Sequence, residues 1–105
     1  MKESEIEKKF TAWCKRRGYV AVKLTSPGRK GVPDRLVLAD NGVSIFIEFK
    51  RPGGKLTILQ QKTKEQWEKL GHEVAVAHSP EDAVARVIEA VRTASISGGR
   101  DTTSS

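Results

Sequence analysis

The spacing of apolar residues predicts a helix followed by three strands in the first half of the chain. Apolar side chains recur every three or four positions between Ile6 and Cys14, and Gly18 is a typical helix end. Two prolines and two glycines between positions 25 and 34 predict a loop. Segments rich in β-branched and aromatic residues lie on either side of that loop, and we expect them to be strands over residues 19–24, 35–39 and 43–50.

The second half of the chain predicts a helix, a strand and a last helix. Thr57 and Gln60 have the spacing of a capping box and open a helix that runs to about Leu70. A short strand over 73–77 and a helix with Pro80 at its first position complete an α-β-β-β-α-β-α order. This order indicates an α/β fold. We expect a single domain over residues 1–93 and a disordered tail over 94–105, where hydrophobic periodicity ends.

The third expected strand, the longest and most apolar, carries two charges. Side chains alternate along a strand, so Glu48 and Lys50 lie on one face and Ile45, Ile47 and Phe49 on the other. Burying an unpaired charge is costly, so each needs a partner, a metal ion or a cleft. A structural ion pair between Glu48 and Lys50 would by itself explain both residues.

The turn before this strand brings in a third charged residue. Asn41-Gly42 is typical of a two-residue hairpin turn, which sets Asp40 opposite Val43 and Asp34 near Phe49. Asp34 would then lie between Glu48 and Lys50 at one end of the sheet, although a one-residue slip in register would alter its facing. On its own, an Asp after a proline is an ordinary turn residue.

These three side chains predict metal-assisted hydrolysis. Two carboxylates this close repel each other unless a cation lies between them. Mg²⁺ prefers oxygen ligands and takes one or two carboxylates while keeping several waters. Such an ion lowers the pKa of a bound water and stabilises charge on a phosphate, and Lys50 adds a further cation for the transition state. The pattern therefore favours cleavage of a phosphodiester.

The charge balance points to nucleic acid. The formal net charge is +6, and most of the excess lies between residues 15 and 55. A small basic protein often meets a polyanion, although a surplus of lysine and arginine also serves solubility alone. We expect the basic residues around the site to contact phosphates, although each alone is an ordinary solvated charge. They are Arg29, Lys30, Arg35, Arg51 and Lys55.

Other classes of protein are disfavoured. Cys14 is the sole cysteine, so the chain can form neither an internal disulfide nor a cysteine-based zinc site. No apolar run approaches the roughly 20 residues needed to span a bilayer, and the charged start does not look like a signal peptide. We therefore expect a cytoplasmic protein with no membrane partner.

The motifs resemble a known nuclease superfamily. Pro33-Asp34 followed by Glu48-Phe49-Lys50 resembles the PD-(D/E)XK signature. The fuller strings GVPDRLV and IEFKRPGGKLTILQ look like the VRR-NUC (virus-type replication-repair nuclease) group, over about residues 3–70. The resemblance implies a restriction-endonuclease-like core with a central mixed sheet flanked by helices. Similar proteins often have a proline where Ile58 stands here.

The resemblance also implies roles for individual residues. Asp34 and Glu48 would ligate Mg²⁺, for which Mn²⁺ may substitute, together with the backbone carbonyl of Phe49. Lys50 would position the attacking water.

Two further residues are implied with an alternative left open for each. Glu7 would reach the metal or its waters from the first helix, and Gln60 would orient groups around the site. Each also fits a capping box, Glu7 with Ser4 and Gln60 with Thr57, which explains them without catalysis.

The implied substrate is DNA. Members similar to junction-resolving enzymes imply a metal-dependent endonuclease that acts on branched DNA, such as four-way (Holliday) junctions or flaps, as a homodimer. A phage-encoded member would act in the host-cell cytoplasm. The same residues leave open a non-catalytic, basic nucleic-acid-binding module, and a nuclease that cuts RNA.

Overall fold

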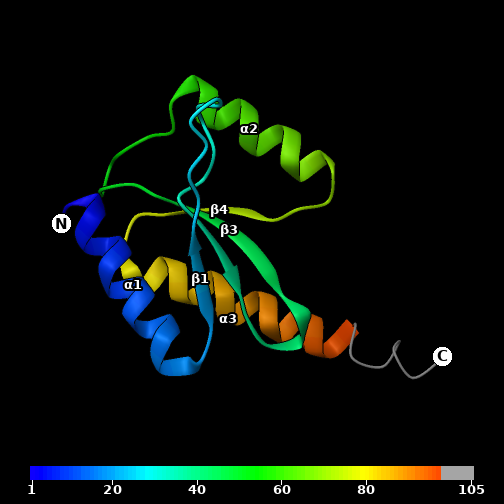
Figure 1. Ribbon diagram of the computed structural model, residues 1–105. Helices are drawn as coiled ribbons and strands as arrows, with labels where there is room; N and C mark the ends of the chain where they lie inside the picture. Colours follow the sequence, from blue (N-terminus) through cyan, green and yellow to red (C-terminus); the bar gives the residue numbers. More distant parts are fainter. Residues whose placement is uncertain (98–105) are drawn as a thin grey trace.

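The helices and strands follow the predicted order. The computed structural model describes residues 1–97 (Figure 1). Its elements are α1 (Glu3–Arg17), β1 (Val20–Lys23), β2 (Arg35–Leu38), the 3-10 turn η1 (Asp40–Gly42), β3 (Ser44–Phe49), α2 (Ile58–Lys69), β4 (Val74–Ala77) and α3 (Pro80–Ser97). In the described part of the chain, no helix has the length and apolar character that a membrane span requires.

The strands form one mixed sheet in the order β1-β2-β3-β4. β1 pairs with β2 and β2 with β3 in antiparallel orientation, whereas β3 and β4 are parallel. β3 lies inside the sheet, as its length and apolar sequence predicted. The parallel step follows from the crossover through α2, because parallel strands cannot be joined by a tight turn.

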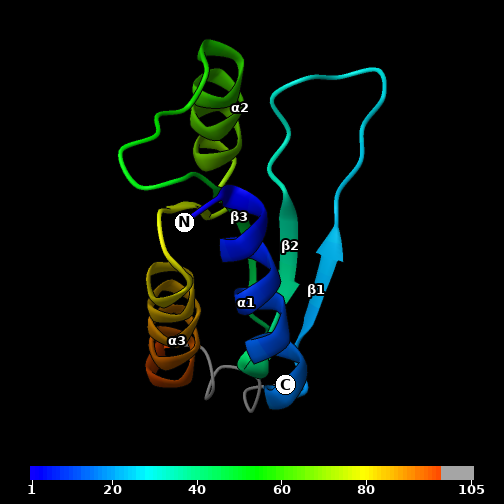
Figure 2. The ribbon, with the colours of Figure 1, turned by 90° about the vertical axis from the view of Figure 1, so that its left-hand side faces the viewer.

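The helices cover the two faces of the sheet unequally (Figures 1 and 2). α1 and α3 pack on one face, where the Phe10 ring lies 5.7 Å from the Phe49 ring. α2 lies on the other face, where the Trp67 ring lies 4.7 Å from the Phe46 ring. Ile45, Ile47 and Phe49 are fully buried in the core beneath α1 and α3. Phe46 and Glu48 therefore lie on the opposite face, as the alternation along β3 predicted, and this is the face that α2 covers.

The predicted capping box at the start of α1 is wrong. The helix begins at Glu3 with Lys2 as its N-cap, and the Lys2 backbone N–H donates to Glu5 Oε1 at 2.9 Å. Ser4 and Glu7 both lie inside the helix, because Glu5 supplies the acceptor at the third helical position. Capping therefore does not account for Glu7. The predicted end at Gly18 is confirmed, with a left-handed φ of 77°.

The predicted register between β2 and β3 is wrong by one residue. The Ala39 N–H donates to the Val43 carbonyl at 2.9 Å, so the turn holds the three residues of η1 instead of two. Asp40 is the extra residue, and its carboxylate accepts a bond of 2.8 Å from the Tyr19 hydroxyl. Arg35 is consequently opposite Ile47. One step further, this register sets Asp34 opposite Glu48 rather than Phe49.

The C-terminal boundary differs from the prediction. α3 continues to Ser97, four residues past the expected end of the domain at residue 93. Ala94 is half-buried, so the last helical turn still has a packed side. Within the expected tail over 94–105, residues 98–105 lie outside the described residues.

The long loop between β1 and β2 runs beside α2 (Figure 2). Gly31 has a φ of +89°, and a Cβ at this position would lie 2.7 Å from the Leu59 carbonyl oxygen. Only glycine tolerates both that φ and that approach. The contact holds the segment that ends at Asp34 against the start of α2.

We expect Gly31→Ala to destabilise the fold by about 1–3 kcal/mol, because it adds backbone strain and a clash with the helix backbone. Gly28→Ala is the matched control in the same loop, since its Cβ would meet no atom within 4 Å. Urea unfolding of both variants measures the difference. Equal midpoints for the two variants would contradict the close approach.

Candidate active site

Glu48 is the buried charge at the centre of the site. It is 5% exposed, and its Oε2 accepts a bond of 2.9 Å from Gln60 Nε2. A cavity of about 10 Å³ adjoins it, with apolar walls that include Pro33, Leu56 and Val76. Burial, followed by the nearby charge of Asp34, raises the pKa of Glu48 to about 8. The carboxyl is therefore held in a setting that favours its protonated form.

The second oxygen of Glu48 has no partner. Among residues 1–97, Oε1 is the sole buried side-chain oxygen or nitrogen without a hydrogen bond. Leaving such an atom unpaired is costly, so its presence in a folded protein calls for an explanation. A proton on the carboxyl or a bound cation would each supply one.

Asp34 is fixed by two bonds at the end of the same sheet. Its Oδ2 accepts from the Phe49 N–H at 2.8 Å, and its carbonyl accepts from the Leu24 N–H at 3.0 Å. Burial raises the pKa of Asp34, the bond from Phe49 opposes this rise, and the charge of Glu7 adds to it. The two bonds and the corrected register place Asp34 beside the end of β3. The sequence predicted this position correctly, although it assumed a two-residue turn.

Lys50 follows β3 and lies against Glu48. Its Nζ is 3.9 Å from Glu48 Oε2, and its side chain is largely buried. The Lys50 N–H donates to the Ala77 carbonyl at 2.9 Å, so the backbone remains bonded to the edge strand β4 just past the end of β3. The predicted Glu48–Lys50 neighbourhood is confirmed. The alternative of a purely structural ion pair between Glu48 and Lys50 leaves Glu48 Oε1 without a partner.

Glu7 approaches from α1 and is held by two cations. Its Oε2 accepts from Lys23 Nζ at 2.9 Å and from Arg35 Nε at 2.7 Å. Burial raises the pKa of Glu7, but the bonds from Lys23 and Arg35 outweigh it and leave the pKa below its ordinary value. Glu7 therefore stays ionised, and its charge acts on both Asp34 and Glu48.

Gln60 serves in the cap and in the site at the same time. Its Oε1 accepts from the Thr57 N–H at 2.9 Å, and its N–H donates to the Thr57 hydroxyl at 3.1 Å, which completes the predicted capping box. Its remaining group, Nε2, donates to Glu48. The capping interpretation is confirmed, and the same side chain also contacts Glu48, so capping does not exclude a role around the site.

The basic residues predicted to contact phosphate divide into two groups. Arg29, Lys30, Arg51 and Lys55 are exposed in the loops around the site. Arg35 is different, because its guanidinium donates to Glu7 and, at 2.9 Å, to the Ala21 carbonyl. Because these bonds tie Arg35 into the fold, we do not assign it a phosphate contact.

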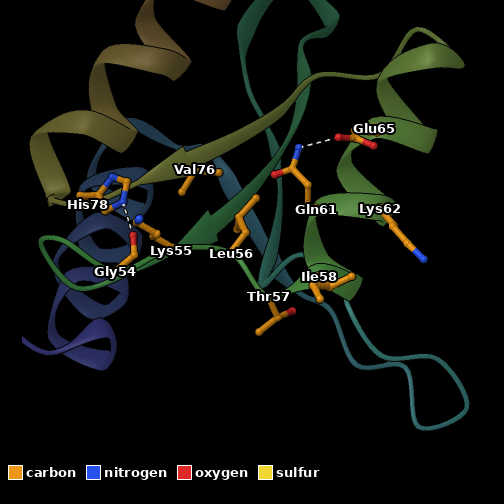
Figure 3. A pocket seen from close by; sticks show the side chains of 10 residues that line it. All are labelled: Gly54, Lys55, Leu56, Thr57, Ile58, Gln61, Lys62, Glu65, Val76 and His78. Atoms are coloured by element: carbon orange, nitrogen blue, oxygen red, sulfur yellow. Dashed lines mark hydrogen bonds between the residues drawn. The ribbon is translucent and has the colours of Figure 1, made fainter.

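Sequence reasoning missed two residues near the site. His78 Nε2 lies 2.9 Å from the Gly54 carbonyl oxygen and so fastens the loop between β3 and α2 (Figure 3). Glu3, in the first turn of α1, adds to the raised pKa of Asp34 and of Glu48. Neither stands in a motif, and only the fold brings them near the end of β3.

The donor set suits a hard divalent cation. Within residues 1–97 there is no group of three acidic, histidine or cysteine side chains arranged to hold a metal, so Glu7 does not join the two carboxylates in one shell. Asp34, Glu48 and a backbone carbonyl nevertheless match the few protein ligands that Mg²⁺ takes while keeping its waters. Glu48 Oε1, which has no hydrogen-bond partner, is the atom that would coordinate such an ion.

Comparison with known proteins identifies the family of the chain. The chain is 44% identical over 79 residues to a protein named "Putative nuclease p44" from Acyrthosiphon pisum secondary endosymbiont phage 1, which covers 75% of this chain and 85% of that protein. A solved structure described as "VRR_NUC domain" matches with a TM-score of 0.73 and 32% identity, over 83% of this chain and 94% of that one. No protein-family model matches the chain.

The fold is that of the restriction-endonuclease-like α/β class, as expected. The chain belongs to the VRR-NUC family of nucleases.

The buried carboxyl makes the stability of the protein depend on pH. Glu48 ionises near 4.5 in the unfolded chain and near 8 in the folded protein, so between these values only the folded state keeps the proton. Stability therefore falls as pH rises through this window. We expect Glu48→Gln to raise Tm at pH 8 by roughly 5 °C and to raise it much less at pH 5.

Thermal unfolding in EDTA, followed by circular dichroism at both pH values, measures this effect. Glu65→Gln, which alters an exposed carboxyl on α2, is the control for loss of one charge. A gain for Glu48→Gln that is the same at pH 5 and pH 8 would mean that the carboxyl does not resist ionisation.

Proposed function

We propose that the protein is a Mg²⁺-dependent endonuclease that hydrolyses phosphodiester bonds in DNA, with branched DNA as its preferred substrate. The observation that carries the proposal is the buried Glu48 carboxyl group. Its Oε2 is bonded by Gln60 and lies 3.9 Å from Lys50 Nζ, whereas its Oε1 has no hydrogen-bond partner. Membership of a nuclease family supports the reaction class.

Asp34 and Glu48 would hold the ion, with the Phe49 carbonyl as a further oxygen ligand. An extended residue directs its N–H and C=O to the same neighbour, so the bond from Phe49 N–H to Asp34 supports this carbonyl facing the Asp34 side. When bound, Mg²⁺ supplies an activated water and stabilises negative charge on the phosphate. Mn²⁺ has similar ligand preferences and is expected to substitute.

The remaining side chains of the site would orient the attacking water and the metal ligands and stabilise charge on the phosphate. Lys50, held near Glu48, positions the attacking water and offers its charge to the phosphate in the transition state. Glu7, ionised and anchored by Lys23 and Arg35, reaches the waters of the ion rather than the ion itself. Gln60 keeps Glu48 Oε2 occupied, so that Oε1 remains the ligand atom.

The exposed cations around the site support a polyanionic substrate. Arg29, Lys30, Arg51 and Lys55 lie in the two loops that flank the end of the sheet, where they contact phosphates on either side of the scissile bond. The similar phage protein favours action in the cytoplasm of the host cell.

We expect Lys50→Ala and Asp34→Asn each to reduce metal-dependent DNA cleavage by about 100-fold or more, since each removes a group that acts on developing charge. Labelled linear, flap and four-way-junction DNA, each incubated with Mg²⁺, Mn²⁺ or EDTA, measures the rate and the preferred shape. Lys69→Ala is the matched control, because Lys69 is an exposed lysine at the other end of α2.

Three outcomes would change the assignment. Full activity of Lys50→Ala and Asp34→Asn would mean that the site is elsewhere. Binding of DNA without cutting under any metal would favour the non-catalytic binding module. Faster cleavage of an RNA version of the same substrates would transfer the proposal to RNA.

The proposed enzyme is a homodimer, as the resemblance to junction-resolving proteins implies. An apolar strip on the face of the sheet opposite α1 supports this: Val20, Val22 and Leu38 are 53%, 38% and 43% exposed. Val20 pairs directly with Leu38, and Val22 lies two positions along the same edge strand, so all three share one face. A cut in each of two strands requires two such sites.

We expect Val22→Lys to convert the dimer to a monomer, because a charge placed in an apolar interface is costly to bury. Light scattering at several protein concentrations gives the mass. Leu70→Lys, at a site that is 71% exposed at the end of α2, is the control and should leave the mass unchanged. A wild-type mass of one chain at every concentration would refute the dimer.

A further inference from the structure

Two consecutive apolar side chains stand in solvent at the start of α2. Ile58 is 75% exposed and Leu59 is 50% exposed. They form the first turn of the helix, directly before Gln60, which bonds Glu48. The capping box is made by Thr57 and Gln60, so it does not require an isoleucine at the first helical position. Packing within the fold does not explain this pair.

The surroundings of the pair are basic. Ile58 lines a hollow of about 720 Å³ together with Lys55 and Lys62, and it points outward from the helix start in Figure 3. Leu59 lines a neighbouring hollow of about 540 Å³, whose basic residues are Arg29, Lys30 and again Lys62. The apolar pair therefore stands between two hollows that are lined by lysine and arginine, the first of which also includes Glu65.

The apolar pair is also held firmly. The Thr57–Gln60 cap fixes the first turn of α2 from one side. From the other side, the close approach of Gly31 to the Leu59 carbonyl braces the same turn against the long loop. A rigid apolar projection flanked by cations matches the way proteins insert aliphatic side chains against bases while contacting the phosphates around them.

We propose that Ile58 and Leu59 form a wedge that separates or unstacks bases where a DNA duplex meets a branch or an unpaired strand. Lys62 and Lys55 hold the phosphates on one side of the wedge, and Arg29 and Lys30 hold those on the other. This inference rests on the proposed nuclease function and gives it a substrate class: duplex DNA that opens next to the scissile phosphate.

The test compares a paired substrate with one that is already open. One four-way junction has fully paired arms. A second has mismatched bases at the crossing, so that the enzyme does not need to separate base pairs there. The double variant Ile58→Ser/Leu59→Ser should cut the paired junction about 10-fold more slowly than wild type, in line with the cost of losing one or two base contacts. It should cut the opened junction within about twofold of wild type, because the separated bases no longer need these contacts.

A fluorescent base gives a second readout that does not depend on cleavage. With 2-aminopurine at the crossing, binding of wild type in EDTA should raise the fluorescence as the base unstacks, and binding of the double variant should not. Leu70→Ser is the matched control, since it removes a leucine that is 71% exposed at the other end of α2 and should behave like wild type.

The results separate failure of the wedge from failure of the nuclease. Equal losses on the paired and opened junctions, no loss on either, or a fluorescence rise that survives in the double variant would each overturn the wedge. If wild type cuts no substrate with any metal, the nuclease proposal fails, and the fluorescence measurement still decides whether Ile58 and Leu59 separate bases.

Discussion

The burial of one carboxylate organises the functional end of this protein. Glu48 lies on an interior strand and faces apolar walls, where water cannot solvate its charge. The fold compensates only partly: Gln60 bonds one oxygen, and Lys50 lies nearby without a close contact. The nearby charges of Asp34, Glu3 and Glu7 work in the opposite direction and increase the cost of ionisation. The divalent cation that we propose would offset the cost of burial and the repulsion together.

Three local structures bring the partners of Glu48 into place. The three-residue turn η1 sets the register that ends with Asp34 opposite Glu48. The α2 cap orients Gln60 so that its amide is left to face the strand. The cations Lys23 and Arg35 hold Glu7 at the edge of the site. The turn and the cap are set by residues close in sequence, whereas Glu7 is held by residues 16 and 28 positions away. The fold joins all three, which explains why the motif positions are scattered along the chain.

The sequence predicted the order of elements because strong local signals agreed with the tertiary structure. Asn41-Gly42, Gly18, Pro80 and the alternation along residues 45–49 each fixed a boundary or a facing. The errors occurred where two signals of similar strength competed. Asp40 could pair or join the turn; in the structure it joins the turn, and its carboxylate accepts a bond from Tyr19, which is distant in sequence. Ser4 and Glu7 matched a cap, but Glu5 lay better placed to bond Lys2. The roles of His78 and Glu3 depend on folded proximity alone, which no spacing rule encodes.

β3 is hydrogen-bonded to β2 on one side and to β4 on the other. This position distinguishes the segments that tolerate sequence change from those that do not. Glu48 lies on the strand that is bonded on both sides and covered on both faces, and local opening there needs disruption of the whole sheet. The residues that we propose to meet the substrate stand instead in loops and on one helix turn, where insertions and substitutions cost little. Such a division allows a lineage to acquire new nucleic-acid preferences by remodelling these outer segments while the hydrolytic machinery stays constant.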